Sequence, residues 1–324
     1  MIANLFMGIP KIKSHSFYFD FFEKGRVPEF YDKIDGIPKV YFQNNNSLEN
    51  QKKHVHVVNC IPPFLLNNEG NFKDSYLSFT KTYRLGYAMY LSEFTSSREY
   101  LRVQLGKKKF KNLRQDYQRL QRDHNVYSKI FYGKIDKKTY SLLFEKLEEF
   151  IKNRFDKLDK NHFALTKWSF YKKTVFEKIK ERKASFLVLY KNSIPIGISL
   201  SYHYGNIMFA AVASFDNHYH KYSLGKQMFA KQLEWCFENN VQLLDTGWGE
   251  FDYKIKFSNA VYKYHTQTLY YKYNLANKTI AFFISWALML KNMASILVYL
   301  KFKSPKTYFK DRLSKLDEFQ VIHP

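Results

Sequence analysis

Acidic residues, glycine, proline and cysteine are all scarce in this chain of 324 residues. With 29 Asp and Glu against 52 Lys and Arg, the formal net charge is +23 at pH 7. Part of this excess reflects the Lys-rich bias of an AT-rich genome, but a charge of this size still favours encounter with nucleic acid, acidic lipid or a phosphate-bearing substrate. Hydrophobic residues make up 45% of the chain, which excludes intrinsic disorder and allows one large domain or two moderate ones.

The scarcity of cysteine argues against disulfides and structural zinc. Cys60 and Cys236 lie far apart and belong to no CxxC or His/Cys cluster. We therefore expect two small buried residues in a reducing compartment. His218 and His220 have no carboxylate or Cys partner at a ligand spacing, so we expect solvated loop residues and no metal site.

Long hydrophobic runs are also missing. The N-terminal sequence has only a short apolar stretch and no small-residue cleavage site, so we expect no secretory signal. In the segment Ile280–Leu300, Lys291 and Asn292 interrupt the apolar run after roughly eleven residues, too few to span a bilayer. We expect a cytoplasmic protein, with peripheral contact to the inner membrane as an open alternative.

The tail from about residue 277 is predicted to be helical and then basic. The pair of helices expected over Ile280–Leu300 either packs on the core or lies in a membrane interface. The lysines that follow suit contact with an anionic leaflet; they are Lys301, Lys303, Lys306 and Lys310.

The first half of the chain mixes short strands with long helices. Apolar residues recur at three- and four-residue intervals across Ser97–His124, which predicts one long helix with nine Lys and Arg against three acids. This basic helix is either an anionic docking surface or an ordinary solvated helix. The other expected elements are strands at Val40–Gln43, His54–Val58 and Tyr83–Leu91, and helices at Tyr140–Arg154 and Lys167–Arg182.

The spacing of apolar residues changes from a helical to a strand pattern at Ser185. Tight turns at Asn192–Ser193 and Gly205–Asn206 then predict three consecutive strands. A helix, a short strand, one helical turn and a last strand follow. The ranges are Ser185–Lys191, Pro195–Tyr204 and Ile207–Ser214, then Leu224–Asn239, Val241–Asp245, Tyr253–Ser258 and Tyr264–Tyr273. We place domain boundaries near residues 135 and 275, which gives segments 1–135, 136–275 and 276–324.

The turn before the helix at Leu224 has the chemistry of a phosphate site. Tyr222, Ser223, Leu224 and Gly225 lead into the helix, whose first N–H groups lack intrahelical acceptors. A pyrophosphate fits such a helix start, Gly225 lets it approach the backbone, and Lys226 adds a positive charge. A Ser that merely caps a helix before Gly is the alternative.

Three segments together resemble one protein family. They are YLRVQLGKKKFKNLRQDYQRLQR (Tyr100–Arg122), VLYKNSIPIGISLSYHYGNIMFAAVASFDNHYHKYSLGKQM (Val188–Met228) and LLDTGWGEFDYKIKF (Leu243–Phe257). The pattern is similar to acetyltransferases of the GNAT superfamily, in particular the branch associated with cellulose and polysaccharide biosynthesis (CelD-like), which is related to the FemABX peptidyltransferases. The resemblance covers about residues 75–275.

This resemblance implies an α+β fold with a mixed, mostly antiparallel sheet flanked by helices. It also implies a tandem arrangement, with residues 1–135 as a degenerate first half and 136–275 as the acyltransferase domain. The donor would be acetyl-CoA or another acyl-CoA, with the thioester near Ala213 and Ser214 and the pyrophosphate at Tyr222–Lys226. Only the central Gly of the usual phosphate loop is retained, and Leu224 stands in place of a Pro.

The same resemblance places the catalytic groups near the strand end at Asp245. Direct attack of an amine on a thioester needs a base and a proton donor. Asp245, Glu250 and Asp252 are the candidate bases and Tyr253 the candidate acid. Each of these four also has an ordinary interpretation as a turn cap, loop acid or core residue.

Two further residues complete the candidates. Lys254 is expected to bind an acidic acceptor, neutralise a phosphate or stabilise the oxyanion. His203 alternates with tyrosines on a strand and is expected to be a core or surface histidine.

Three functions follow as alternatives. The first is an acyl-CoA-dependent N-acyltransferase that acts by direct transfer on a small-molecule or sugar-linked amine, a precursor of surface polysaccharide. The second is a FemABX-like transferase that uses aminoacyl-tRNA. The third is a non-catalytic basic protein that binds membrane or nucleic acid through a decayed acyltransferase fold.

Overall fold

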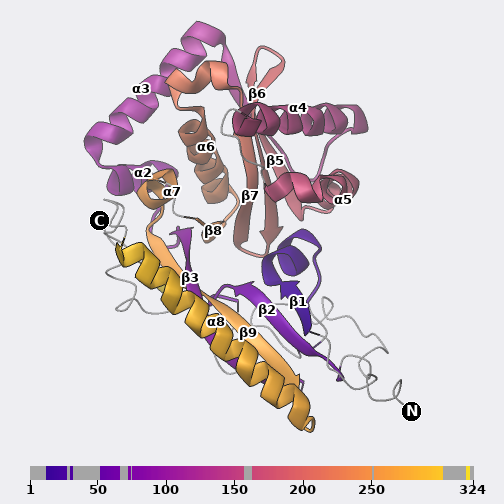
Figure 1. Cartoon of the computed structure of the whole chain (residues 1–324). Helices are drawn as coiled ribbons and strands as arrows, with labels where there is room; N and C mark the ends of the chain where they lie inside the picture. Colours follow the sequence, from indigo (N-terminus) through magenta and orange to yellow (C-terminus); the bar gives the residue numbers. More distant parts are fainter. Residues whose placement is uncertain are drawn as a thin grey trace. The chain divides into compact units, whose positions relative to one another are not determined.

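The computed structural model describes residues 12–27, 30–31, 52–65, 72–73, 75–156, 163–249, 252–301 and 319–321 (Figure 1). The chain divides into two compact units. The first unit comprises Met1–Gly86 and Val261–Gln320, and the second comprises Tyr87–Ala260 and Val321–Pro324. These divisions fall at other positions than the boundaries near residues 135 and 275, so the domain assignment from sequence stays a prediction.

The first unit is built on strands from both ends of the chain. β1 pairs in parallel with β2, and β2 pairs antiparallel with β9. Its core is rich in tyrosine: the Tyr262 hydroxyl lies 2.9 Å from that of Tyr18 and 2.8 Å from that of Tyr264. The elements are β1 (Ile12–Ser16), η2 (Phe19–Glu23), β2 (Val55–Ile61), most of β3 (Tyr76–Tyr90), β9 (Ala260–Tyr271), α8 (Leu275–Lys301) and β10 (Phe319–Val321).

The second unit contains the sheet that positions the candidate site. Neighbouring strands β4, β5, β6 and β7 are antiparallel in sequence order, and β8 then pairs with β7 in parallel. The strands are β4 (Val126–Phe131), β5 (Ala184–Lys191), β6 (Ile194–Tyr204), β7 (Ile207–Phe215) and β8 (Leu243–Trp248). The helices are α2 (Ser97–Leu105), α3 (Lys107–His124), α4 (Lys137–Asp156), η4 (Phe163–Lys167), α5 (Trp168–Lys180), η5 (Asn217–Tyr222), α6 (Leu224–Glu238) and α7 (Asp252–Phe257).

Helices cover both faces of this sheet. Phe186 of β5 packs on Phe144 of α4, with ring centroids 5.4 Å apart, whereas its neighbour Leu187 belongs to the cluster that contains Leu224 and Met228 of α6. Because successive side chains of a strand point to opposite faces, α4 and α6 lie on opposite sides. The α+β fold with a mostly antiparallel sheet flanked by helices is thus confirmed, while the tandem arrangement stays a prediction.

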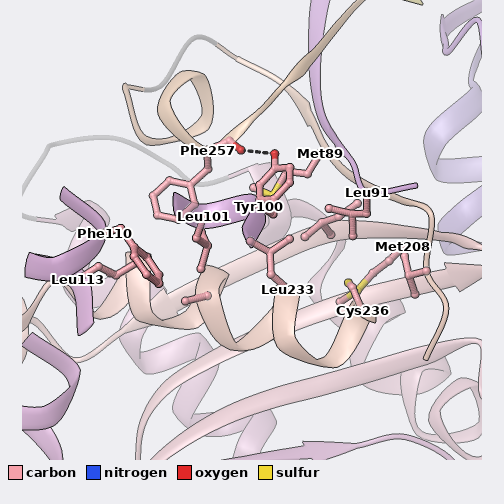
Figure 2. Close-up of a cluster of buried hydrophobic side chains, with 13 residues drawn as sticks. Met89, Leu91, Tyr100, Leu101, Phe110, Leu113, Met208, Leu233, Cys236 and Phe257 are labelled. Atoms are coloured by element: carbon pink, nitrogen blue, oxygen red, sulfur yellow. Dashed lines mark hydrogen bonds between the residues drawn. The ribbon is translucent and has the colours of Figure 1, made fainter. Parts of the chain in front are cut away.

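The predicted single helix over Ser97–His124 is wrong in one respect: it is two helices joined at Gly106. This glycine has φ of 76° and ψ of 156°, a conformation that residues with a Cβ avoid, so α2 ends there and α3 starts in a new direction. Tyr100 of α2 donates to the Phe257 carbonyl, and α2, α3, α6 and α7 share one buried cluster (Figure 2). This packing is why α2 and α3 belong to the second unit.

Other predictions are confirmed with shifted ends. The strands expected near residues 54, 83, 185, 195, 207, 241 and 264 correspond to β2, β3, β5, β6, β7, β8 and β9, while β4 was not predicted. Val40–Gln43 lies outside the described residues. The pair of helices expected over Ile280–Leu300 is one helix, α8, because Lys291 and Asn292 fit into it without a break. Among the described residues, no helix is long and apolar enough to cross a membrane.

Candidate functional site

β7 and β8 form a short parallel pair and then separate. Their pairing runs from Ile207 opposite Leu243 to Phe209 opposite Asp245. β7 continues to Phe215, and in the described strands its last part has β6 as its partner but not β8. Backbone N–H and C=O groups along this part of β7 are therefore open to a ligand on the β8 side.

A β-bulge marks the start of the open part of β7. Leu200 pairs with Val212 and Ser201 with Ala210, so Ala211 is the extra residue. A bulge interrupts the ladder and re-aims the residues that follow. Beyond it, Ala213 is exposed and Ser214 is 1% exposed.

The Ser214 hydroxyl is one of several buried side-chain groups that have no hydrogen-bond partner among the residues that the structure describes. A buried hydroxyl normally has a partner, so this orphan calls for an explanation. A ligand along the open edge of β7 would supply one. The structure thus brings Ala213 and Ser214, both predicted donor residues, to the place where β7 leaves β8.

The start of α6 lies beside the end of β7. Ser223 has φ of 55°, and its carbonyl accepts from the N–H groups of Lys226 and Gln227. The N–H groups of Leu224 and Gly225 remain at the open end of the helix, where an anion is stabilised. A Cβ on Gly225 would lie 3.2 Å from the Phe215 ring, so glycine permits this close approach.

The other residues of the predicted phosphate turn have different environments. The Lys226 side chain is exposed and free to meet a phosphate, whereas Leu224 is fully buried. The Tyr222 hydroxyl lies 3.0 Å from His124 Nε2 and donates to Asp123 at 3.4 Å. Tyr222 therefore ties this turn to the end of α3 rather than pointing to an open site.

Asp245 of β8 and Lys254 of α7 are both buried at the end of β8. Asp245 is fully buried and accepts from the Gly247 N–H at 2.8 Å. The Lys254 ammonium donates to the carbonyls of Thr246 and Trp248, the latter at 3.0 Å. Both residues thus bind the backbone of residues 246–248 at the end of β8, and the Thr246 hydroxyl adds a bond to the Tyr87 carbonyl at 2.7 Å.

Burial lowers the pKa of Lys254 to about 8, and the Asp245 carboxylate opposes this shift. The ammonium is therefore still mostly charged at neutral pH, but it loses its proton more readily than an exposed lysine.

Tyr253 is a third titratable group at this site, beside Asp245 and Lys254. Burial raises the pKa of its phenol, and the positive charge of Arg154 acts in the opposite direction. The ring packs on Phe229 of α6 with centroids 5.4 Å apart. A phenol with a raised pKa stays protonated at neutral pH and can donate a proton.

Arg154, in the last turn of α4, is a residue that the sequence did not single out. Its guanidinium lies 5.2 Å from the centroid of the Phe215 ring at the end of β7. Within the described part of the chain, no carboxylate forms an ion pair with it. In sequence Arg154 has the pattern of an ordinary cation at a helix C-terminus, so only its contacts in the folded chain mark it as a candidate site residue.

The remaining candidates from the sequence have the following positions in the structure. Glu250 lies outside the described residues, and the structure describes only the backbone of Asp252, as the first residue of α7. His203 accepts or donates to the Ser185 hydroxyl at 2.8 Å, and burial lowers its pKa to about 4, as expected of a core histidine. His218 is exposed and pairs with Asp216 at 2.6 Å. No cluster of potential metal ligands occurs among the residues that the structure describes.

The bulge in β7, the separation of β7 from β8 and the start of α6 all lie within one segment that matches a known family. Residues 107–255 match the acetyltransferase (GNAT) domain family. This GNAT segment begins with α3 and ends in α7, so it contains the separating strands, the α6 start, Asp245, Tyr253 and Lys254. The GNAT resemblance is confirmed for this segment, whereas the polysaccharide-associated branch stays a prediction.

Several solved structures are similar to this chain at low identity. FemX has 8% identity and a TM-score of 0.45 over 74% of this chain and 77% of its own. L-PGS from Bacillus licheniformis has 12% identity and a TM-score of 0.44 over 76% of each chain. PaiA N-acetyltransferase from Thermoplasma acidophilum, in complex with coenzyme A, has 13% identity and a TM-score of 0.30 over 36% of this chain and 74% of its own. No curated protein matches the chain.

The lowered pKa of Lys254 predicts a pH-dependent stability. Between about pH 8 and pH 10 the unfolded chain keeps the lysine proton while the folded chain releases it. The unfolded state then binds more protons, so the free energy of unfolding rises with pH in this window, by about 2 kcal/mol. Below pH 8 both states are protonated and this slope vanishes.

Urea unfolding of the wild type and of Lys254→Met at a series of pH values measures this effect. The difference in free energy of unfolding between the two proteins should move in favour of the wild type as the pH rises through the window. A difference that stays constant from about pH 7 to about pH 10 would contradict the buried position of the ammonium.

Proposed function

We propose that this chain is an acyltransferase that moves an acyl group, acetyl in the simplest case, from an acyl-CoA to an amine. The observation that carries the proposal is the open edge of β7 beside the α6 start, within a segment of the GNAT family. The edge offers backbone hydrogen bonds to an amide-containing arm, and the helix start offers N–H groups to a pyrophosphate. Acyl-CoA carries both of these groups in one molecule.

The proposed reaction is direct transfer. The amine nitrogen attacks the thioester carbon, a C–N bond forms and the C–S bond breaks. The amine gives its extra proton to a carboxylate, for which Glu250 and Asp252 are the candidates, and the departing thiolate takes a proton from Tyr253. Asp245 and Lys254 act as positioning residues, because both are hydrogen-bonded to the backbone at the end of β8.

Neither cysteine fits a covalent acyl-enzyme. Cys236 is buried in the α6 cluster with its Sγ 3.5 Å from the Met208 sulfur, and burial raises the pKa of its thiol. A thiol with a raised pKa supplies little thiolate for attack. Cys60 lies in the first unit, outside the GNAT segment.

The proposed acceptor is an amino sugar or a related precursor of surface polysaccharide, and this choice follows the resemblance to the polysaccharide-associated branch. The guanidinium of Arg154 near the end of β7 has no ion-pair partner among the described residues, and this supports an acceptor that carries a negative charge. No metal takes part in the proposed reaction.

Aminoacyl-tRNA is the second candidate donor, because α3 carries a strong positive face. Its exposed cations are Lys107, Lys108, Lys109, Lys111, Arg114, Arg119 and Arg122. Among the described residues, only Arg122 of this set forms an ion pair, with Asp123. Such a face attracts a polyanion by neutralising its phosphates.

Tyr253→Phe removes only the proposed proton donor. We expect kcat for acetyl transfer to fall about a hundredfold while the Kd for acetyl-CoA stays the same, since the ring still packs on Phe229. Steady-state kinetics together with calorimetric titration of acetyl-CoA measure the two quantities. An unchanged kcat would exclude Tyr253 as the acid.

The function itself is tested by incubating the protein with amino-sugar acceptors and either labelled acetyl-CoA or labelled aminoacyl-tRNA. Transfer of label from acetyl-CoA to an acceptor amine supports the proposal. Transfer from aminoacyl-tRNA alone would replace it with the second candidate. Protein with Gly225→Trp, which fills the helix start, is the negative control for the first donor.

A further inference from the structure

The outward side of α8 carries large apolar side chains in water. Phe282, Phe283, Trp286 and Leu290 are 52%, 59%, 50% and 41% exposed, and we name these four residues the aromatic stripe. They are spaced by one, three and four residues, so they lie on one side of the helix. Scattered apolar residues are ordinary on a surface, but a contiguous row of this kind marks an interaction site.

The other side of α8 is already buried within the first unit. Asn277, Ala281 and Ser285 are buried on that side, and Ala281 packs with Val55 and Tyr270. Ile280 and Ile284 pack against the same cluster. Apolar side chains therefore lie on both sides of the helix, and those of the aromatic stripe stay half exposed, although the Phe282 ring also meets that of Phe79 at a centroid distance of 6.1 Å.

Charge decides which partner fits the aromatic stripe. The segment Leu275–Lys301 contains no Asp or Glu, and exposed Lys278 and Lys291 flank the stripe. Aromatic rings and lysines side by side match the boundary of a bilayer, where rings enter the headgroup region and ammonium groups meet lipid phosphates.

We propose that the aromatic stripe of α8 docks on the surface of a bilayer rich in anionic lipid. This inference goes beyond the proposed function and stands independently of it. A second copy of the chain fits the stripe poorly, because two chains with a net charge of +23 each repel one another. An anionic bilayer attracts the same charge, at about 1 kcal/mol for each lysine near the surface.

Vesicle sedimentation of the full chain tests the docking. We expect the protein to sediment with vesicles of equal parts phosphatidylcholine and phosphatidylglycerol at low salt, and to stay in solution with phosphatidylcholine alone. Phe283→Ser should weaken partitioning about tenfold, and Phe283→Ser with Trp286→Ser about a hundredfold. The matched control is Ile194→Ser in β6, because Ile194 is 62% exposed, and it should bind like the wild type.

Tryptophan fluorescence locates the contact. Trp286 should shift its emission to shorter wavelength when the anionic vesicles are added, and Trp286→Phe should abolish that shift while still sedimenting. Sedimentation of the double serine variant with anionic vesicles to the same extent as the wild type would overturn the proposal. A wild type that does not sediment with these vesicles would overturn it as well. A lipid-free dimer that only the serine variants break would assign the stripe to a second copy instead.

Discussion

Lys254→Met is expected to lower the free energy of unfolding by about 2–3 kcal/mol at neutral pH, because the cost of the lost hydrogen bonds exceeds the relief of no longer burying an ammonium. Lys254 is 9% exposed and Asp245 is fully buried. Removing the ammonium takes the neighbouring cation away from the buried Asp245 carboxylate and removes the hydrogen bonds that Lys254 donates to the Thr246 and Trp248 carbonyls. The loss of the buried bond to Thr246 costs more free energy than the loss of the part-buried bond to Trp248.

The matched control is the double variant Lys254→Met with Asp245→Asn, which removes both charges. The Asn keeps an oxygen for the Gly247 N–H, so the double variant should recover about 2 kcal/mol relative to Lys254→Met. Urea denaturation of the four proteins in the cycle gives the coupling energy. Costs that simply add would show that the two charges do not interact, contrary to the structure.

Ala213→Trp should reduce acetyl transfer about a hundredfold or more without unfolding the protein. Ala213 is exposed on the open part of β7, so an indole fits there without disturbing the core. It would occupy the edge along which the proposed donor lies, and displacing the thioester by about 1 Å is enough for a loss of this size.

The matched control is Ala276→Trp, which makes the same change at an exposed alanine of α8 in the first unit. We expect the control to keep wild-type transfer. Equal activity of Ala213→Trp and the control would place the donor somewhere other than the edge of β7.

The sequence predicted those parts of the fold that depend on local signals. Tight turns at Asn192–Ser193 and Gly205–Asn206 separate the strands β5, β6 and β7, and alternation or continuous apolar runs make each strand visible. The helix start at Leu224 was equally clear. By contrast, β4 has polar residues through its middle and gave no strand pattern.

What the sequence could not predict depends on contacts between distant residues. The φ of Gly106, which divides the basic segment into α2 and α3, follows from the packing of Tyr100 against Phe257 as much as from the glycine. Arg154 meets Phe215 only because α4 runs along the sheet next to β7. Likewise, a helix with apolar residues on both sides and polar Asn277 and Ser285 on its buried side does not reveal in sequence which side is exposed, so the exposed side of α8 became visible only in three dimensions.

Only those residues of the candidate site that lie close together in the strand–turn–helix order could be predicted from the sequence. Ala213, Ser214, Gly225 and Lys226 follow the strand–turn–helix order, so sequence alone places them near one another. Asp245 and Lys254 were placed less well, because both side chains are buried and hydrogen-bonded to the end of β8 rather than open to a ligand.

Thermal unfolding with and without acetyl-CoA, on the wild type and on Ala213→Trp, tests the central claim most directly. A ligand that binds only the folded protein raises its stability, by about 2.7 kcal/mol at a hundred times Kd. The account predicts a rise in melting temperature for the wild type and for Ala276→Trp, and none for Ala213→Trp. A wild type that acetyl-CoA does not stabilise, or an Ala213→Trp variant that it stabilises equally, would contradict a donor site at the edge of β7.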